Sequence, residues 1–145
     1  MPFAIGIEHT KTKENVGTLW RSAYNFGASM VFTVGKRYKH QGSDTTKTWR
    51  HIPLLHFQSW DDYREHMPYQ WMNVGIEITK TAQSIFSFTH PKQVVYILGA
   101  EDCGLSKEAI ALCKHIVYIP SRYCLNVATA GSIVMYDRLL KEGKA

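Results

Sequence analysis

The sequence lacks the features that mark membrane proteins, disulfide-rich proteins and metal centres. No run of about 18 apolar residues occurs, so no membrane-spanning helix is expected. The three cysteines, Cys103, Cys113 and Cys124, are an odd number without a Cys-x-x-Cys pair, which argues against a disulfide framework or a zinc site. The N-terminus has no basic leader and no long apolar core, so no signal peptide is expected. These absences favour a protein of the reducing cytoplasm that needs no metal.

Two phosphate-binding signatures are also missing. The glycine-rich turn of a simple Rossmann nucleotide site is absent, because the first predicted strand is followed by Glu8-His9-Thr10-Lys11. No Gly-x-x-x-x-Gly-Lys-Ser/Thr segment occurs, which excludes a P-loop. The sequence also contains no internal repeat and no low-complexity linker.

The composition is that of a soluble globular domain. The 145 residues are 45% hydrophobic and 20% charged, and we expect them to form one domain over residues 1–145. The formal net charge of +5 favours a polyanionic partner such as nucleic acid.

Strand and helix signals alternate along the chain. Strands are expected at 3–7, 30–34, 73–78, 94–98 and 116–119, and helices at 15–26, 60–67, 107–113 and over a long terminal segment ending at 142. Asn15 is the expected N-cap of the first helix, and Gly27 its C-terminal stop. Continuous apolar strands separated by helices predict an α/β domain with a mainly parallel sheet covered on both faces.

The terminal helix is apolar almost all round. Such a helix must be buried against the body of the protein or against a second subunit. Glycine-rich or polar segments follow three predicted strands, at 35 onward, 99–104 and 120–126, where ligands bind in parallel sheets. A polar Asn126, set in the turn before the terminal helix, is the first indication of a site.

Three segments together resemble the SpoU/TrmH family of SPOUT RNA methyltransferases. Residues 15–23 follow the pattern Asn-x-Gly-x-x-x-Arg-x-Ala, and residues 99–105 follow Gly-x-Glu-x-x-Gly-Leu. Ile119-Pro120, followed by Leu125-Asn126-Val127-Ala128, resembles the third motif. The motifs occur in the family's order and spacing, and the resemblance covers nearly the whole chain.

The resemblance implies a fold and an activity that pattern reading does not reach. The family fold ends in a deep trefoil knot, which the general rarity of knotted chains would have excluded. It also implies a homodimer that holds S-adenosylmethionine in the knot. The reaction implied is methylation of a ribose 2′-hydroxyl in RNA. Because the resemblance brings no appended RNA-binding domain, tRNA is favoured over rRNA as the substrate.

The resemblance also implies a set of catalytic residues. Arg21 meets the ribose and phosphate of the RNA, and Asn15, Glu101 and Asn126 support it. An arginine stays protonated in almost any setting, so it clamps the phosphate and lowers the hydroxyl's pKa more readily than it acts as a base. Without the resemblance, Arg21 would be a solvated surface residue, Asn15 and Asn126 helix caps, and Glu101 a carboxylate near a helix start.

Further residues of the chain are expected to bind the cofactor and the RNA. Backbone groups at Ile78, Gly99, Ile119 and Leu125 are expected to hold the cofactor, with Cys124 at its rim. A basic loop with interleaved aromatic residues is expected to contact RNA beside Arg21, through Lys36, Arg37, Lys39 and Arg50.

Three alternatives stay open at this point. Cys124 stands where the family commonly has serine, which motivates a non-catalytic RNA-binding or cofactor-sensing knot protein. An unrelated flavodoxin-like or Rossmann-like protein for a small ligand is the second. A cysteine nucleophile at Cys124 is the third, although no histidine partner can be named from the sequence.

Overall fold

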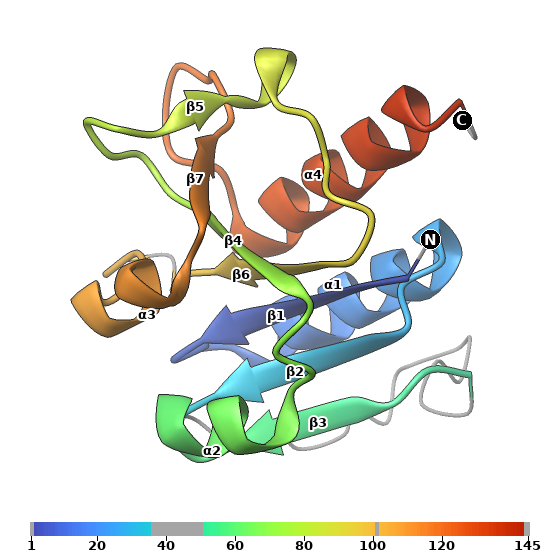
Figure 1. Ribbon diagram of the computed structural model, residues 1–145, viewed down its shortest axis with the longest axis vertical. Coiled ribbons are helices and arrows are strands. Elements are labelled where there is room, and N and C mark those ends of the chain that lie inside the picture. The colour runs from blue at the N-terminus through green and yellow to red at the C-terminus, as the bar shows by residue number, and fades with distance from the viewer. Residues whose placement is uncertain (1, 36–50, 101, 144–145) are drawn as a thin grey trace.

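The structure, a computed structural model, describes residues 2–35, 51–100 and 102–143 (Figure 1). Within these residues, parallel strands form one seven-stranded sheet in the order β3-β2-β1-β6-β4-β7-β5. The strands are β1 (Phe3–Glu8), β2 (Met30–Val34), β3 (Leu54–Phe57), β4 (Met72–Ile76), β5 (Gln83–Ser84), β6 (Val94–Leu98) and β7 (His115–Tyr118). The helices are α1 (Lys13–Phe26), α2 (Trp60–His66), α3 (Lys107–Leu112) and α4 (Val127–Lys141), with a 3-10 turn at Ile85–Ser87.

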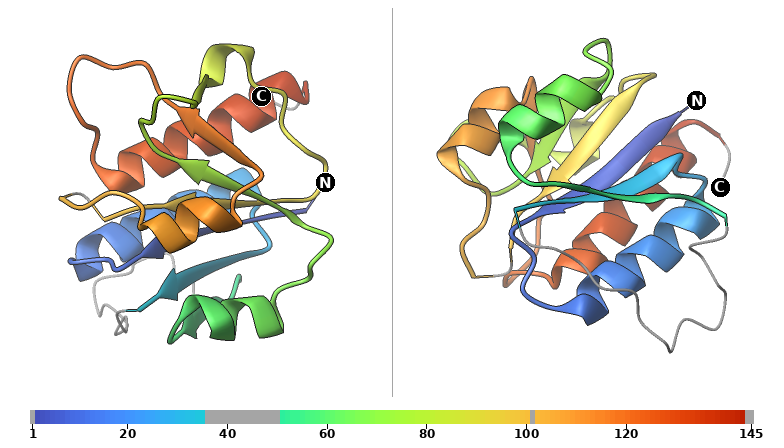
Figure 2. Two further views of the ribbon diagram at one scale, coloured as in Figure 1. Left: turned by 60° about the vertical axis from the view of Figure 1, so that its left-hand side comes forward. Right: turned by 90° about the horizontal axis from the view of Figure 1, so that it is seen from below.

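Helices cover both faces of the sheet, as the sequence predicts for a parallel sheet. Figure 2 shows α1 and α4 side by side on one face and α2 and α3 on the other. Each face has its own apolar cluster, one with α1 and α4 and one with α2 and α3. Every residue of the central strands β1 and β6 is buried, which explains their continuous apolar sequence. The predicted α/β class is confirmed.

Most predicted elements are present, with corrections at their ends. The first helix begins at Lys13, because the Thr12 side chain accepts a hydrogen bond from the Asn15 backbone N–H and so occupies the N-cap. The predicted N-cap at Asn15 is therefore wrong. Gly27 ends this helix with φ of 85°, in the left-handed region that glycine tolerates. Strands β3 and β5 were not predicted.

Helix α4 is only partly covered within one chain. Its inner face packs on α1 and the sheet, while Ile133, Tyr136 and Leu140 are 37%, 50% and 58% exposed. These three residues recur at helical spacing, so they form one apolar face toward solvent. None of the described helices has the length and apolar character needed to cross a membrane.

The buried face of α4 contains an arginine that apolar periodicity did not predict. The Arg138 side chain is fully buried and donates hydrogen bonds to the carbonyl oxygens of Pro91 (2.7 Å) and Lys92 (3.0 Å). Its guanidinium also pairs with Glu142 at 2.8 Å. A buried charge is tolerated when it is paired and hydrogen-bonded, so this residue fixes α4 to the segment before β6.

A histidine completes this attachment. The His90 ring contacts the Tyr96 hydroxyl through Nδ1 and the Asp137 carboxylate through Nε2, the latter at 2.7 Å. Burial lowers the pKa of His90 below its ordinary 6.5; the Asp137 carboxylate opposes this shift, and the charges of Lys141 and Arg138 add to it. His90 is therefore held in its neutral form.

The neutral His90 makes stability depend on pH in a defined direction. Because its pKa is lower in the folded than in the unfolded chain, the unfolded chain binds more protons below about pH 6.5. The free energy of unfolding should therefore fall as the pH falls through this range. Urea unfolding of the wild type and of His90→Gln at pH 7.5 and 5.5 measures this difference. The variant should lose less stability on acidification, and equal losses would contradict the assignment.

Candidate active site

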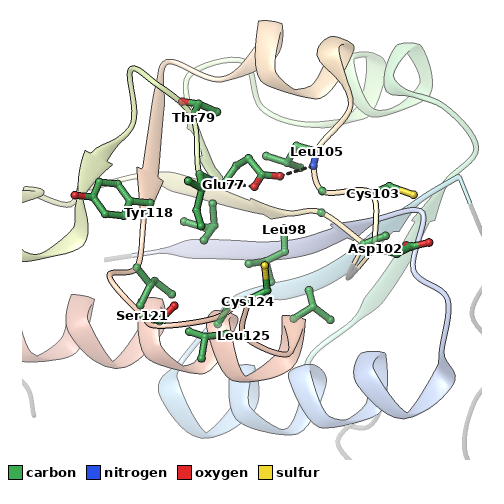
Figure 3. Close-up of a pocket in the computed structure, with 18 of the residues that line it drawn as sticks. Glu77, Thr79, Leu98, Asp102, Cys103, Leu105, Tyr118, Ser121, Cys124 and Leu125 are labelled. Atoms are coloured by element: carbon green, nitrogen blue, oxygen red, sulfur yellow. Dashed lines mark hydrogen bonds between the residues drawn. The ribbon is translucent and has the colours of Figure 1, made fainter.

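A pocket of about 520 Å³ opens at the carboxyl ends of β4, β6 and β7 (Figure 3). Its walls come from residues 76–79, 98–100, 102–105, 118–119, 121, 124–125 and 127, together with Ile110 of α3 and Ala130 of α4. This is the sheet edge at which the sequence placed a ligand site. The pocket is lined by each of the five residues expected to hold the cofactor: Ile78, Gly99, Ile119, Cys124 and Leu125.

The loop after β6 has a backbone turn that only glycine permits. A Cβ on Gly99 would lie 2.3 Å from the backbone carbon of Gly104, a contact that no side-chain movement relieves. The Gly104 N–H donates to the Ala100 carbonyl at 2.9 Å, which closes the turn. Gly104 itself has φ of 64°, in the left-handed region. The two glycines of the second motif therefore shape the pocket wall.

Two carboxylates hold the exit of this loop through consecutive backbone amides. Glu77 accepts a hydrogen bond from the Leu105 N–H at 2.8 Å, and Glu8 accepts one from the Ser106 N–H at 2.8 Å. Glu8 is buried and also accepts from the Ser106 hydroxyl and the Trp60 indole N–H, both at 2.6 Å. Sequence reasoning missed both acids, although a carboxylate ending an apolar strand is a signal.

An asparagine pair joins the first and third motifs. The Asn126 side-chain amide donates to the Asn15 side-chain oxygen at 2.9 Å, across 111 positions of sequence. The Asn126 oxygen accepts from the backbone N–H groups of Ala128 and Thr129 and so caps α4. Asn126 is thus a helix cap, as expected without the resemblance, and its side-chain amide also contacts Asn15 of the first motif.

Replacing Asn126 by aspartate separates these roles. The carboxylate keeps the cap and suits the positive end of the helix, but it has no N–H to donate to Asn15. We expect the melting temperature to stay within a few degrees of wild type, while the methyl transfer that the family resemblance implies falls about tenfold or more. The alanine variant removes the cap as well, and should lose about 1 kcal/mol of stability in urea. Wild-type activity in Asn126→Asp would contradict a role for the pair.

Arg21 lies outside the pocket lining. It is exposed on α1, the helix that carries Asn15, and its backbone carbonyl accepts from the Asn25 side chain at 3.1 Å. Its exposure suits a group that meets a large substrate. The remaining predicted residues lie outside the residues that the structure describes: Glu101, Lys36, Arg37, Lys39 and Arg50.

The cysteines and the lining residues do not form a nucleophilic or metal site. Burial, with the nearby charge of Glu8, raises the pKa of Cys113 to about 12, so this thiol stays protonated. Cys103 and Cys124 line the pocket, but no histidine does among the described residues. In the same residues, no group of three or more potential ligands could hold a metal ion. Within the part of the chain that the structure describes, the cysteine-nucleophile alternative therefore finds no histidine base in the pocket.

The comparison with known families shows to which family this chain belongs. The model of the SpoU rRNA Methylase family matches residues 2–136, almost the whole chain. The chain belongs to this family. A search of curated protein sequences finds no match.

Solved structures share the SpoU fold. The SpoU methyltransferase AviRb from Streptomyces viridochromogenes aligns with a TM-score of 0.80 and 22% identity, over 98% of this chain and 61% of that one. An AdoMet-bound rRNA methyltransferase from Sinorhizobium meliloti aligns with a TM-score of 0.84 and 21% identity, over 97% and 56%. The chain thus spans about three fifths of their length. A protein described by its 2-OH methylation of C/U34 on tRNA aligns with a TM-score of 0.81 and 17% identity, over 99% and 98%.

Proposed function

We propose that this SpoU-family protein transfers the methyl group of S-adenosylmethionine to a ribose 2′-hydroxyl of RNA. The observation that carries the proposal is the pocket at the ends of β4, β6 and β7, which the second and third family motifs build together. A relative with the same fold holds AdoMet, and another is described by 2-OH methylation of tRNA. The net charge of +5 suits a polyanionic substrate.

The residues of the pocket fit the cofactor. Leu98, Ile119 and Leu125 offer apolar contacts for an adenine ring, and the turn at Gly99 lets backbone groups approach closely. Bound there, the sulfonium of S-adenosylmethionine would supply an electrophilic methyl group. No metal is needed for this chemistry.

The protein's task is then to place the 2′-oxygen in line with that methyl group and to ease loss of its proton. Arg21 would bind the phosphate and ribose as a charged clamp, which lowers the hydroxyl's pKa without taking the proton. The Asn15–Asn126 pair would position the ribose at the junction of α1 and α4. We assign Glu101, outside the described residues, as a fourth member of this set.

Among RNAs, we propose tRNA as the substrate, because one protein with the same fold is described by 2-OH methylation of tRNA. The basic loop with Lys36, Arg37, Lys39 and Arg50 is the segment that we propose for contact with the RNA.

The proposal includes the family's trefoil knot and homodimer. Two features support the knot: β7 lies between β4 and β5, and the segment after β7 lines the same pocket as the segment that leaves β4. The apolar outer face of α4 supports the dimer, because Ile133, Tyr136 and Leu140 are exposed there together.

A double substitution tests the dimer. Ile133→Glu with Leu140→Glu places charges on the outer face of α4 without touching its buried side, so the wild-type dimer should become a monomer. Light scattering or sedimentation measures the mass. Tyr69→Glu is the matched control, since Tyr69 is 92% exposed outside α4, and it should stay dimeric. A monomeric wild type would overturn this part of the proposal.

The function itself is tested by calorimetric titration with S-adenosylhomocysteine, followed by transfer of labelled methyl groups to RNA. We expect about one binding site per subunit and label in nucleotides that resist alkaline cleavage, because a methylated 2′-oxygen cannot attack the phosphate. Absence of binding to the folded protein would favour the alternative, a non-catalytic RNA-binding knot protein, for which the cysteine at 124 is the motivating feature.

A further inference from the structure

Within the described residues, the pocket contains one carboxylate whose charge is not balanced by a neighbouring cation. Glu77 directly follows β4 and lines the pocket, with its side chain turned across the wall toward Leu105 (Figure 3). Its two oxygens accept hydrogen bonds from the Leu105 and Ile78 backbone N–H groups, both at 2.8 Å. Among the described residues, it takes part in no ion pair.

The surrounding structure holds this carboxylate in place. A Cβ on Gly104 would lie 2.1 Å from the Glu77 carboxylate oxygen, so glycine at that position makes room for it. The other acid of the lining, Asp102, differs in its environment, because the Lys11 ammonium binds it and holds its pKa below the ordinary range. No lysine, arginine or histidine lines the pocket within the described residues.

We propose that Glu77 makes the pocket discriminate between the cationic cofactor and its neutral product. This inference rests on the proposed function and concerns the charge of the ligand. S-adenosylmethionine carries one more positive charge than S-adenosylhomocysteine, located on the sulfonium. In a partly enclosed pocket, a fixed carboxylate attracts that charge more strongly than it would in water.

Weaker binding of the neutral product would help the protein to release it after each methyl transfer. When the methyl carbon leaves sulfur for the ribose oxygen, the carbon–sulfur electron pair stays on sulfur and the hydroxyl proton leaves to solvent. The sulfonium thereby becomes a neutral thioether, and the attraction to Glu77 is lost. Product release is favoured by this loss, and the product competes less well with fresh cofactor.

Calorimetry tests the proposal by comparing the dissociation constants of three ligands of similar shape. They are S-adenosylmethionine, S-adenosylhomocysteine and sinefungin. Sinefungin has a carbon that bears an ammonium group in place of the sulfonium. The wild type should bind the two cationic ligands about tenfold more tightly than the neutral one at low salt. Glu77→Gln, which removes the charge and keeps the shape, should reduce that ratio to about twofold. Added salt should also reduce the wild-type ratio of the dissociation constants of neutral and cationic ligands, because salt screens the attraction between charges.

Glu8→Gln is the matched control, because Glu8 holds the adjacent amide of the same loop but does not line the pocket. Loss of loop support alone should change all three dissociation constants by one common factor. If Glu77→Gln also shifts all three equally, Glu77 only supports the loop and the inference is overturned. If the wild type binds none of the three ligands, the proposed cofactor site itself fails, a result distinct from equal binding of all three.

Discussion

Replacing Arg21 by alanine is expected to reduce the proposed methyl transfer to RNA about a thousandfold, because it removes the charged group to which we assign stabilisation of the transition state. The protein should still fold and bind S-adenosylhomocysteine. Arg21 is exposed on α1 and lies outside the pocket lining, so its removal leaves the residues that line the pocket in place. Single-turnover methylation with saturating cofactor, beside calorimetry on the same preparation, separates the two effects.

Two further variants define what the arginine does. Arg21→Lys keeps the charge but loses the bidentate fork, so it should recover only part of the activity if Arg21 clamps a phosphate. Lys114→Ala removes an equal charge from an exposed position in the loop before β7 and should retain wild-type activity. Full activity in Arg21→Ala would exclude the proposed role.

Replacing Gly99 by alanine is expected to abolish cofactor binding. The new Cβ would lie 2.3 Å from the backbone of Gly104, so the loop that forms one pocket wall must move. Strain of this kind costs about 3 kcal/mol or more when the neighbour cannot yield. If that cost falls on the bound conformation, the dissociation constant for S-adenosylhomocysteine rises at least about a hundredfold. Calorimetry measures the change directly.

The control for Gly99 is a second glycine in a different environment. A Cβ on Gly6, in β1, would lie 2.4 Å from the Phe32 ring, on the α2 and α3 side of the sheet and outside the pocket lining. Gly6→Ala should therefore lower the melting temperature but leave the affinity for S-adenosylhomocysteine near wild type. Loss of binding in both variants would show that instability, and not the pocket wall, explains Gly99→Ala.

The central strands of the sheet were the elements easiest to predict from the sequence. Strands β1 and β6 are continuous apolar runs because both of their faces are covered. Strand β3 escaped prediction because His56 interrupts its apolar pattern, although the ring contacts the Thr33 hydroxyl at 2.9 Å. Strand β5 is two residues long and pairs only with β7, too short a segment for any periodic signal.

The candidate site, too, could be predicted only in part from the sequence. Residues of the second and third motifs line the pocket, whereas no residue of the first motif does. The predicted strand at 73–78 ended two residues late, because β4 ends at Ile76 and the next two residues, Glu77 and Ile78, line the pocket. The contacts of Glu8 and Glu77 with the second motif could not be predicted. They depend on which strand ends lie side by side, and the order β1-β6-β4 is a property of the folded sheet.

The hydrogen bonds that join distant parts of the chain have a consequence for biosynthesis. Glu8 holds Ser106 across 98 positions, and Asn15 holds Asn126 across 111. A nascent chain on the ribosome therefore lacks one wall of the pocket until the segment after β7 has emerged and α4 can dock against α1. Acquisition of cofactor affinity should mark the end of folding rather than an early step, and pairings so distant make that end slow. Pulse-labelled chains captured on immobilised S-adenosylhomocysteine would then be full-length chains, with no shorter translation intermediates among them.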